Sequence, residues 1–142
     1  KLFKKKNFDF VFGTVLRNYT KNKILKYGFD FDRIKYNFDF ATSHTTGFFL
    51  KKKIYKKIGN YNTKFKISAD YDLYFRLYKG NFIGGYTSKK DKIGNVASGG
   101  YSSKRTFLSH LVEESKIRLH NKQNIFIVIL IILNAIIKNF IK

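Results

Sequence analysis

The chain of 142 residues contains no cysteine, proline, tryptophan or methionine. The absence of cysteine excludes disulfide bonds and metal sites built from thiolates. Because a natural reading frame begins with methionine and this sequence begins with Lys1, we expect the chain to be a piece of a longer protein. Its length allows one domain with a modest hydrophobic core.

Acidic side chains are also scarce. There are 9 Asp and Glu against 29 Lys and Arg, which gives a formal net charge of +20. Such a charge favours anionic partners, namely nucleic acid, anionic lipid surfaces or nucleotide phosphates. Most of the basic residues are lysines, with runs at 4–6 and 51–53, and arginine, which recognises phosphates and bases in a bidentate manner, is rare. This pattern favours a solvated surface attracted to membranes, and we do not expect a nucleic-acid partner. The alternative is a non-catalytic basic module that binds nucleic acid or an anionic membrane.

Alternation of apolar and polar residues predicts strands in the first part of the chain. Residues 8–16 fit one strand interrupted by Gly13, and the polar, lysine-rich residues 17–26 fit a loop. Three short runs alternate aromatic and acidic residues with a period of two, which is typical of strands. These runs are Phe8-Asp9-Phe10, Phe29-Asp30-Phe31-Asp32 and Phe38-Asp39-Phe40.

Helical periodicity begins after residue 50. Residues 51–58 predict a short helix that ends at Gly59, and residues 69–78 predict a longer one with Ser68 as its N-cap. The rest of the chain up to residue 120 is expected to form a strand at 81–87, a Gly/Ser-rich loop at 91–104 and a helix at 106–120.

Asp70 is the first candidate for chemistry. It lies three residues before Leu73 and four before Tyr74, so it shares their face of the predicted helix, at the N-terminal end of the apolar stripe. A carboxylate there faces any cleft at the helix end, is stabilised in its ionised form by the helix N-terminus, and suits a general base. Asp72 points elsewhere and is spaced to pair with Arg76. The alternative for Asp70 is an N-terminal helix charge with no further role.

Four blocks of sequence, in order, extend this interpretation. They are His44-Thr45-Thr46-Gly47-Phe48-Phe49-Leu50, then Ile54-Tyr55 with Ile58-Gly59-Asn60-Tyr61, then Phe65-Lys66-Ile67-Ser68-Ala69-Asp70-Tyr71-Asp72-Leu73 followed by Arg76-Leu77, and last Ser98-Gly99-Gly100-Tyr101-Ser102-Ser103. Over residues 8–105 this pattern resembles the family 2 glycosyltransferases, and it is similar to those that build bacterial surface polysaccharides. Ala69-Asp70-Tyr71-Asp72 is the most specific block.

The resemblance implies an α/β fold, namely the C-terminal, acceptor-side half of a GT-A-type, Rossmann-like domain with a helical C-terminal tail. The reaction it implies is inverting transfer of a sugar from a nucleotide-sugar donor to a hydroxyl of a glycan or lipid-linked acceptor. Such an enzyme works in the cytoplasm, here with a peripheral position on the inner face of the membrane. An inactive remnant of such an enzyme is a further alternative.

The resemblance also assigns roles to residues. Asp70 corresponds to the catalytic base, and His44 to a histidine near the donor diphosphate or the acceptor. Asp72 and Arg76 become candidates for the donor or acceptor site, and Gly99, Gly100 and Ser102 for a mobile loop over the site. The alternatives are a His44 bonded to neighbouring Thr and Ser hydroxyls and, for the glycines, an ordinary surface turn.

A divalent cation, Mg²⁺ or Mn²⁺, is implied by the same resemblance. The Asp-x-Asp pairs of this chain lie in the wrong context for the family's metal motif: residues 30–32 precede the His44 block, and residues 70–72 lie on a helix where the two carboxylates diverge by about 200°. We therefore expect no metal ligand in this chain, with the cation's ligands mostly outside it.

Residues 125–137 form an apolar tail interrupted only by Asn134. The run is short for a membrane-spanning helix, which takes about 20 apolar residues. It fits an interfacial helix, a buried packing helix, the start of a membrane segment, or a strand, and we favour association with a membrane. We therefore divide the chain into catalytic-domain residues 1–106 and a tail of residues 107–142.

Overall fold

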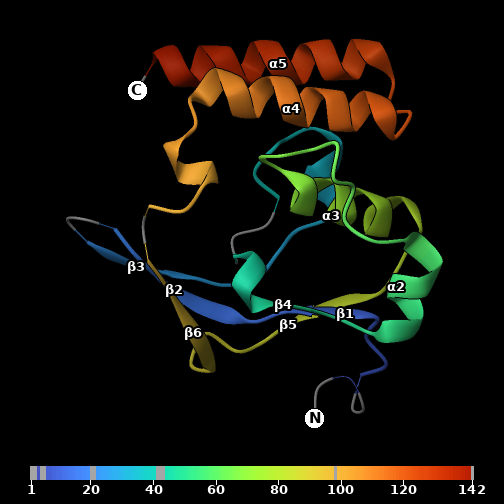
Figure 1. Ribbon diagram of the computed structural model, residues 1–142, viewed down its shortest axis with the longest axis vertical. Helices are drawn as coiled ribbons and strands as arrows, with labels where there is room; N and C mark the ends of the chain where they lie inside the picture. The colour runs from blue at the N-terminus through green and yellow to red at the C-terminus, as the bar shows by residue number, and fades with distance from the viewer. Residues whose placement is uncertain (1–2, 4–5, 20–21, 41–43, 98, 142) are drawn as a thin grey trace.

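The computed structural model describes residues 3, 6–19, 22–40, 44–97 and 99–141, and it confirms a mixed α/β fold. Figure 1 shows the strands gathered on one side of the molecule and the helices stacked on the other, with α3 between the strands and the α4–α5 pair. The last described helix, α5, lies on the side of the molecule opposite the strands.

The first sheet has three short strands in the order β4-β1-β5. The central strand β1 (Phe10–Phe12) pairs antiparallel with β4 (Phe48–Leu50) and parallel with β5 (Gly84–Tyr86). All three residues of β1 are buried. A strand enclosed on both faces reads as a continuous apolar run, as Phe-Val-Phe does here.

The second sheet has the order β3-β2-β6. Its central strand β2 (Thr14–Asn18) pairs antiparallel with β3 (Lys23–Lys26) and parallel with β6 (Lys92–Ala97). Gly13 separates β1 from β2, as the sequence predicts. A Cβ at Gly13 would lie 2.0 Å from the end of the Ile93 side chain, so a larger residue here would have to displace that side chain.

Two predicted loops are wrong in part. Residues 17–18 complete β2 and residues 23–26 form β3, because Arg17 and Asn18 extend the β2 ladder against Ile24 and Lys23. Within the predicted loop at 91–104, residues 92–97 form β6 on the other side of β2. A lysine-rich polar segment can form a strand when it pairs with a neighbouring strand and packs against that strand's side chains.

Only the last residue of the first aromatic–acidic run, Phe10, lies in a strand, and the other two runs are not strands. Asp30 accepts a hydrogen bond from the backbone N–H of Asp32, and this Asx turn leads into a 3₁₀ helix, η1 (Asp32–Lys35). Residues 38–40 are irregular, and residues 41–43 lie outside the described part of the chain. The rings of these runs enter the core from loops. Phe10 stacks on Phe31 with ring centroids 5.0 Å apart.

The first two predicted helices are confirmed. α2 (Lys52–Ile58) ends at Gly59, whose φ of 80° favours glycine, and α3 (Ala69–Lys79) ends at Gly80. Ser68 precedes α3, but its side chain makes no capping bond. Instead the Glu113 carboxylate accepts hydrogen bonds from the backbone N–H groups of residues 66, 67 and 68, at 3.1, 2.6 and 2.7 Å.

The third predicted helix is also confirmed, as α4 (Phe107–His120), whose N-cap Thr106 accepts a hydrogen bond from the Ser109 N–H. The tail forms a helix as well, α5 (Ile125–Phe140), so the strand alternative is wrong. α4 and α5 lie side by side across the top of Figure 1. Within the described residues, no helix has the length and apolar character needed to cross a bilayer.

The core lies between α3 and the first sheet. It is built mostly from aromatic rings, which β1, the loop at 38–40 and α3 supply. Its buried members are Phe10, Phe12, Ile34, Phe40, Ile54, Tyr71, Tyr74, Phe75, Leu77 and Ile117.

Arg118 of α4 is completely buried at the edge of this core. Its guanidinium donates to the carbonyls of Ile34 and Asn37 and to the Tyr71 hydroxyl, so the buried charge is hydrogen-bonded. It fastens α4 to η1 and to α3.

Candidate functional site

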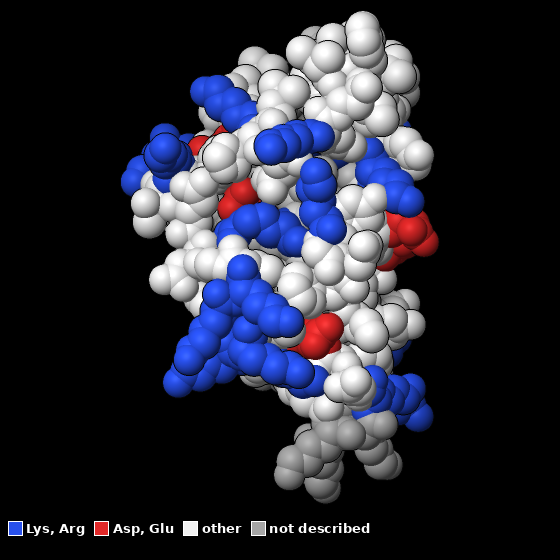
Figure 2. Space-filling view, turned by 90° about the vertical axis from the view of Figure 1, so that its right-hand side faces the viewer, with Lys and Arg blue, Asp and Glu red and all other residues white. Residues whose placement is uncertain are grey.

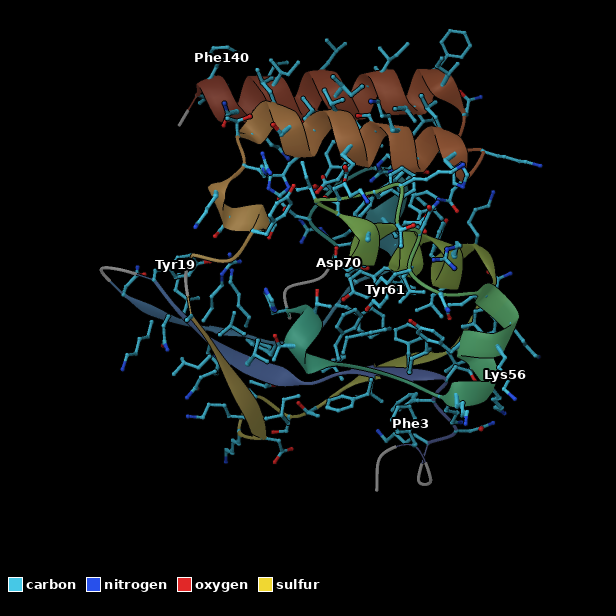
Figure 3. All side chains as sticks on the ribbon, viewed as in Figure 1. Phe3, Tyr19, Lys56, Tyr61, Asp70 and Phe140 are labelled. Carbon is cyan, nitrogen blue, oxygen red and sulfur yellow. The ribbon has the colours of Figure 1, made fainter. Side chains whose placement is uncertain are left out.

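A pocket of about 310 Å³ opens at the N-terminal end of α3, and we call it the Asp70 pocket. Segments far apart in sequence line it: β2, the loop at 38–40, the 3₁₀ turn η2 (Thr45–Gly47) with its N-cap His44, the start of α3, the loop before α4, and α4 itself. Figure 3 shows Asp70 at the end of α3 that faces η2 and that loop. The polar and charged residues that line the Asp70 pocket are Arg17, Asp39, His44, Thr45, Ser68, Asp70, Tyr71, Tyr74, Ser102, Ser103, His110 and Glu114.

The carboxylate of Asp70 is half-buried and held from two sides. Its Oδ2 accepts a hydrogen bond from the Thr45 hydroxyl, and its Oδ1 accepts one of 2.9 Å from the backbone N–H of Tyr71. Each carboxylate oxygen has two lone pairs, so one on each oxygen stays available to a ligand. The position on the buried face of the helix end is the one that the sequence predicts.

Tyr74 extends this arrangement by one turn of α3. Its hydroxyl donates a hydrogen bond of 3.4 Å to the Thr45 oxygen, which in turn donates to Asp70. Burial, and next the negative charge of Asp70, raise the pKa of Tyr74 well above its usual value, so the phenol keeps its proton. Donors therefore point in one direction, from Tyr74 through Thr45 to Asp70.

His44 lines the same pocket as a neutral imidazole. Its Nδ1 accepts a 3.2 Å hydrogen bond from the Thr46 N–H, which places the ring proton on Nε2. Burial lowers the pKa of His44, and the charge of Arg17 lowers it further, although Asp70 opposes both. The Thr46 hydroxyl lies 3.1 Å from Nδ1, so the predicted bonding to a neighbouring threonine is present, and Nε2–H remains as a donor.

A second carboxylate, that of Glu114, reaches the pocket from α4. It accepts a hydrogen bond of 3.3 Å from the Ser68 hydroxyl and lies 3.9 Å from the His110 ring. Burial raises the pKa of Glu114 to about 7, and the nearby charges of Asp39 and Asp70 add to the effect against the opposing Ser68 bond. The pocket thus holds one acid that titrates near neutral pH.

Asp72 and Arg76 do not face the pocket. The buried Asp72 carboxylate pairs with Arg76 at 2.9 Å and accepts a 2.9 Å bond from the Asn121 side chain. Arg76 donates to the carbonyls of Ile58 and Asn60, so it ties α3 to the end of α2. The predicted i,i+4 ion pair is confirmed, and the pair joins three helices on the side of α3 away from Asp70.

The Gly/Ser-rich segment contributes only part of what was expected of it. Ser102 and Ser103 line the pocket, whereas Gly99 and Gly100 are exposed and are not among its lining residues. Gly99 has a φ of 100°, and a Cβ there would meet nothing within 4 Å, which fits a surface turn. Ser98 lies outside the described residues.

A divalent cation would need several oxygen or nitrogen ligands gathered in one place. Within them, no group of three or more His, Asp or Glu side chains is placed to hold a metal ion. Asp70 and Asp72 point to different sides of α3, and Asp72 is already committed to Arg76 and Asn121. Asp70 and Asp72 therefore do not form a metal site together.

Several pocket residues were missed at the sequence level. Thr45 lay inside a block that was singled out, and Tyr74 lay just after one, where its spacing to Asp70 was a usable signal. Arg17 was assigned to a loop, and Glu114 lies 46 residues from its partner Ser68, so nothing local in the sequence could have indicated either.

Comparisons of this chain with protein-family models, with curated proteins and with solved structures found no match.

Proposed function

We propose that this chain is the acceptor-side part of a nucleotide-sugar glycosyltransferase of the GT-A type, and that Asp70 is its general base. The observation that carries the proposal is the placement of Asp70 and His44 in one pocket. They come from two separate blocks of the sequence pattern that resembles family 2 glycosyltransferases, and both line the same pocket of about 310 Å³.

In the proposed reaction Asp70 accepts the proton of the acceptor hydroxyl. An acceptor hydroxyl gives its proton to a free lone pair of Asp70, and its oxygen forms the new bond to the anomeric carbon of the donor sugar. The bond from that carbon to the nucleoside diphosphate breaks, and the diphosphate leaves with the electron pair. A positioned carboxylate contributes about 10²- to 10⁴-fold to such a step.

The surrounding side chains suit this role. Thr45 fixes the rotamer of Asp70 while leaving lone pairs for the acceptor. The neutral His44 offers Nε2–H to a sugar or diphosphate oxygen, and Arg17 supplies a positive charge in the same pocket. Ser102 and Ser103 add hydroxyl groups of the kind that hydrogen-bond sugars.

The test compares sugar transfer by the natural gene product that carries these residues with its Asp70→Asn variant, using UDP- and GDP-sugars in the presence of Mg²⁺ or Mn²⁺. We expect the variant to lose activity by about a hundredfold or more, with an unchanged circular dichroism spectrum. Asp91→Asn is the matched control, because Asp91 is exposed on the loop before β6 and should retain full activity. Equal activity of the Asp70→Asn variant, or no transfer by the native protein from any donor, would contradict the proposal.

A further inference from the structure

α5 buries very little of its apolar surface. Only Val128 and Ile131 of its 16 residues are buried, and both lie on the side that packs on α4. At about 100° per residue, the opposite side of the helix is apolar as well, where an amphipathic surface helix would carry polar residues. We name this exposed face the α5 stripe, and its members are Phe126, Ile129, Leu130, Leu133, Ile137 and Phe140.

The stripe is strongly exposed along the full length of the helix. Phe126, Leu130 and Phe140 have exposed fractions of 73%, 65% and 84%. All six members fall within an arc of about 100° at the helical repeat, so they form one continuous band. Exposed apolar bands of this kind mark sites of contact with another protein or with a membrane.

The charges around the band favour an anionic membrane as its partner. From Ser115 to the last residue the sequence holds no Asp or Glu, whereas Lys116, Lys122 and Lys138 are exposed there. Figure 2 shows the α5 end of the molecule free of charged side chains in that view, with Lys and Arg side chains gathered below it. An apolar face bordered by cations is the arrangement of helices that lie in the headgroup region of anionic bilayers.

We infer that the α5 stripe docks on an anionic lipid bilayer, with α5 lying in the plane of the membrane surface. A second copy of the chain is a poorer occupant, because two copies that each carry a net charge of +20 repel each other. This inference concerns a surface separate from the Asp70 pocket and stands whether or not the chain transfers sugars.

The first experiment measures binding of the full chain to sedimented vesicles of phosphatidylcholine, with and without about one third phosphatidylglycerol. We expect binding to the anionic vesicles that weakens as salt is added. Replacing Phe126, Leu130, Leu133 and Ile137 by Gln should lower the partition coefficient by about tenfold or more, since each side chain loses apolar burial in the interface. The control is the Tyr36→Gln, Ile83→Gln double variant, which changes residues that are 64% and 56% exposed elsewhere on the surface.

A second readout uses the absence of tryptophan from the sequence. The Phe126→Trp variant carries one indole, whose emission should shift to the blue with anionic vesicles and should be quenched by brominated lipid. No binding to anionic vesicles by the folded chain would overturn the inference, as would full binding by the four-Gln variant. Assembly into a dimer that the four-Gln variant abolishes, with no lipid binding, would assign the stripe to a second copy.

Discussion

Thr45 donates a hydrogen bond to the carboxylate of Asp70, although the two residues are 25 positions apart in the sequence. Thr45 lies in the η2 turn and Asp70 in the first turn of α3, so the bond joins two elements that the fold brings together. Tyr74 completes the connection by donating to Thr45. The orientation of the proposed base therefore depends on a hydroxyl from another element.

Replacing Thr45 by Val removes that donor with little change in shape. We expect kcat for sugar transfer to fall by about tenfold, because a carboxylate free to rotate spends less time in the reactive position, while KM for the donor changes little. Thr45→Ser keeps the hydroxyl and should restore kcat to near the native value. Steady-state kinetics of the three proteins give the result, and an unchanged kcat in Thr45→Val would show that this bond does not position Asp70.

Replacing Asp72 by Ala should affect stability far more than chemistry. The variant leaves Arg76 without its carboxylate and Asn121 without its acceptor, and breaking a buried pair in this way costs about 3 kcal/mol. Urea denaturation measures the loss against the Asp91→Ala control, which should change the unfolding free energy by less than about 0.5 kcal/mol. If a folded Asp72→Ala protein lost transfer activity with its stability intact, Asp72 would belong to the site instead.

Glu114 makes stability depend on pH. Burial raises its pKa in the folded protein to about 7, from 4.5, so between these values the folded state holds a proton that the unfolded state releases. The unfolding free energy therefore falls as the pH rises from about 4.5 to about 7. Because the side chain is still 19% exposed, we expect the contribution to be about 2 kcal/mol, below that of the full shift.

The Glu114→Gln variant cannot ionise and still offers an oxygen to the Ser68 hydroxyl. The unfolding free energy of this variant, relative to that of the native protein, should therefore rise by about 2 kcal/mol between pH 4.5 and pH 7.5. Urea titrations across that range measure the difference. Parallel curves for the two proteins over the whole range would mean that Glu114 is ionised in the folded state at pH 5.

The elements that the sequence predicted well are those set by local rules. α2, α3 and α4 follow helical spacing and end at glycines or begin at a threonine cap, and Gly13 interrupts the first strands where two segments cross. The position of Asp70 at the end of an apolar stripe follows from the same spacing. Short-range periodicity was sufficient for these features.

The features that were missed depend on distant partners. Glu113 from α4 accepts hydrogen bonds from the backbone just before α3, and the Ser68 hydroxyl donates to Glu114 without capping the helix. Residues 29–32 have the alternation of a strand, but the Asx turn at Asp30 and the burial of several rings favour a loop. β6 pairs with the edge of β2 that β3 does not occupy. No pattern within residues 92–97 reveals this pairing.

The connection at Gly13 also shapes how the chain folds. β1 and β2 form one extended run divided between two sheets, and Thr14 bonds Thr87 and Ser88 across 73 and 74 residues of chain. Closing so long a loop is slow and entropically unfavourable, but β5 and β6 follow each other closely in sequence. The two parallel pairings therefore share a single loop-closure event, and the sheets are coupled as one cooperative folding unit.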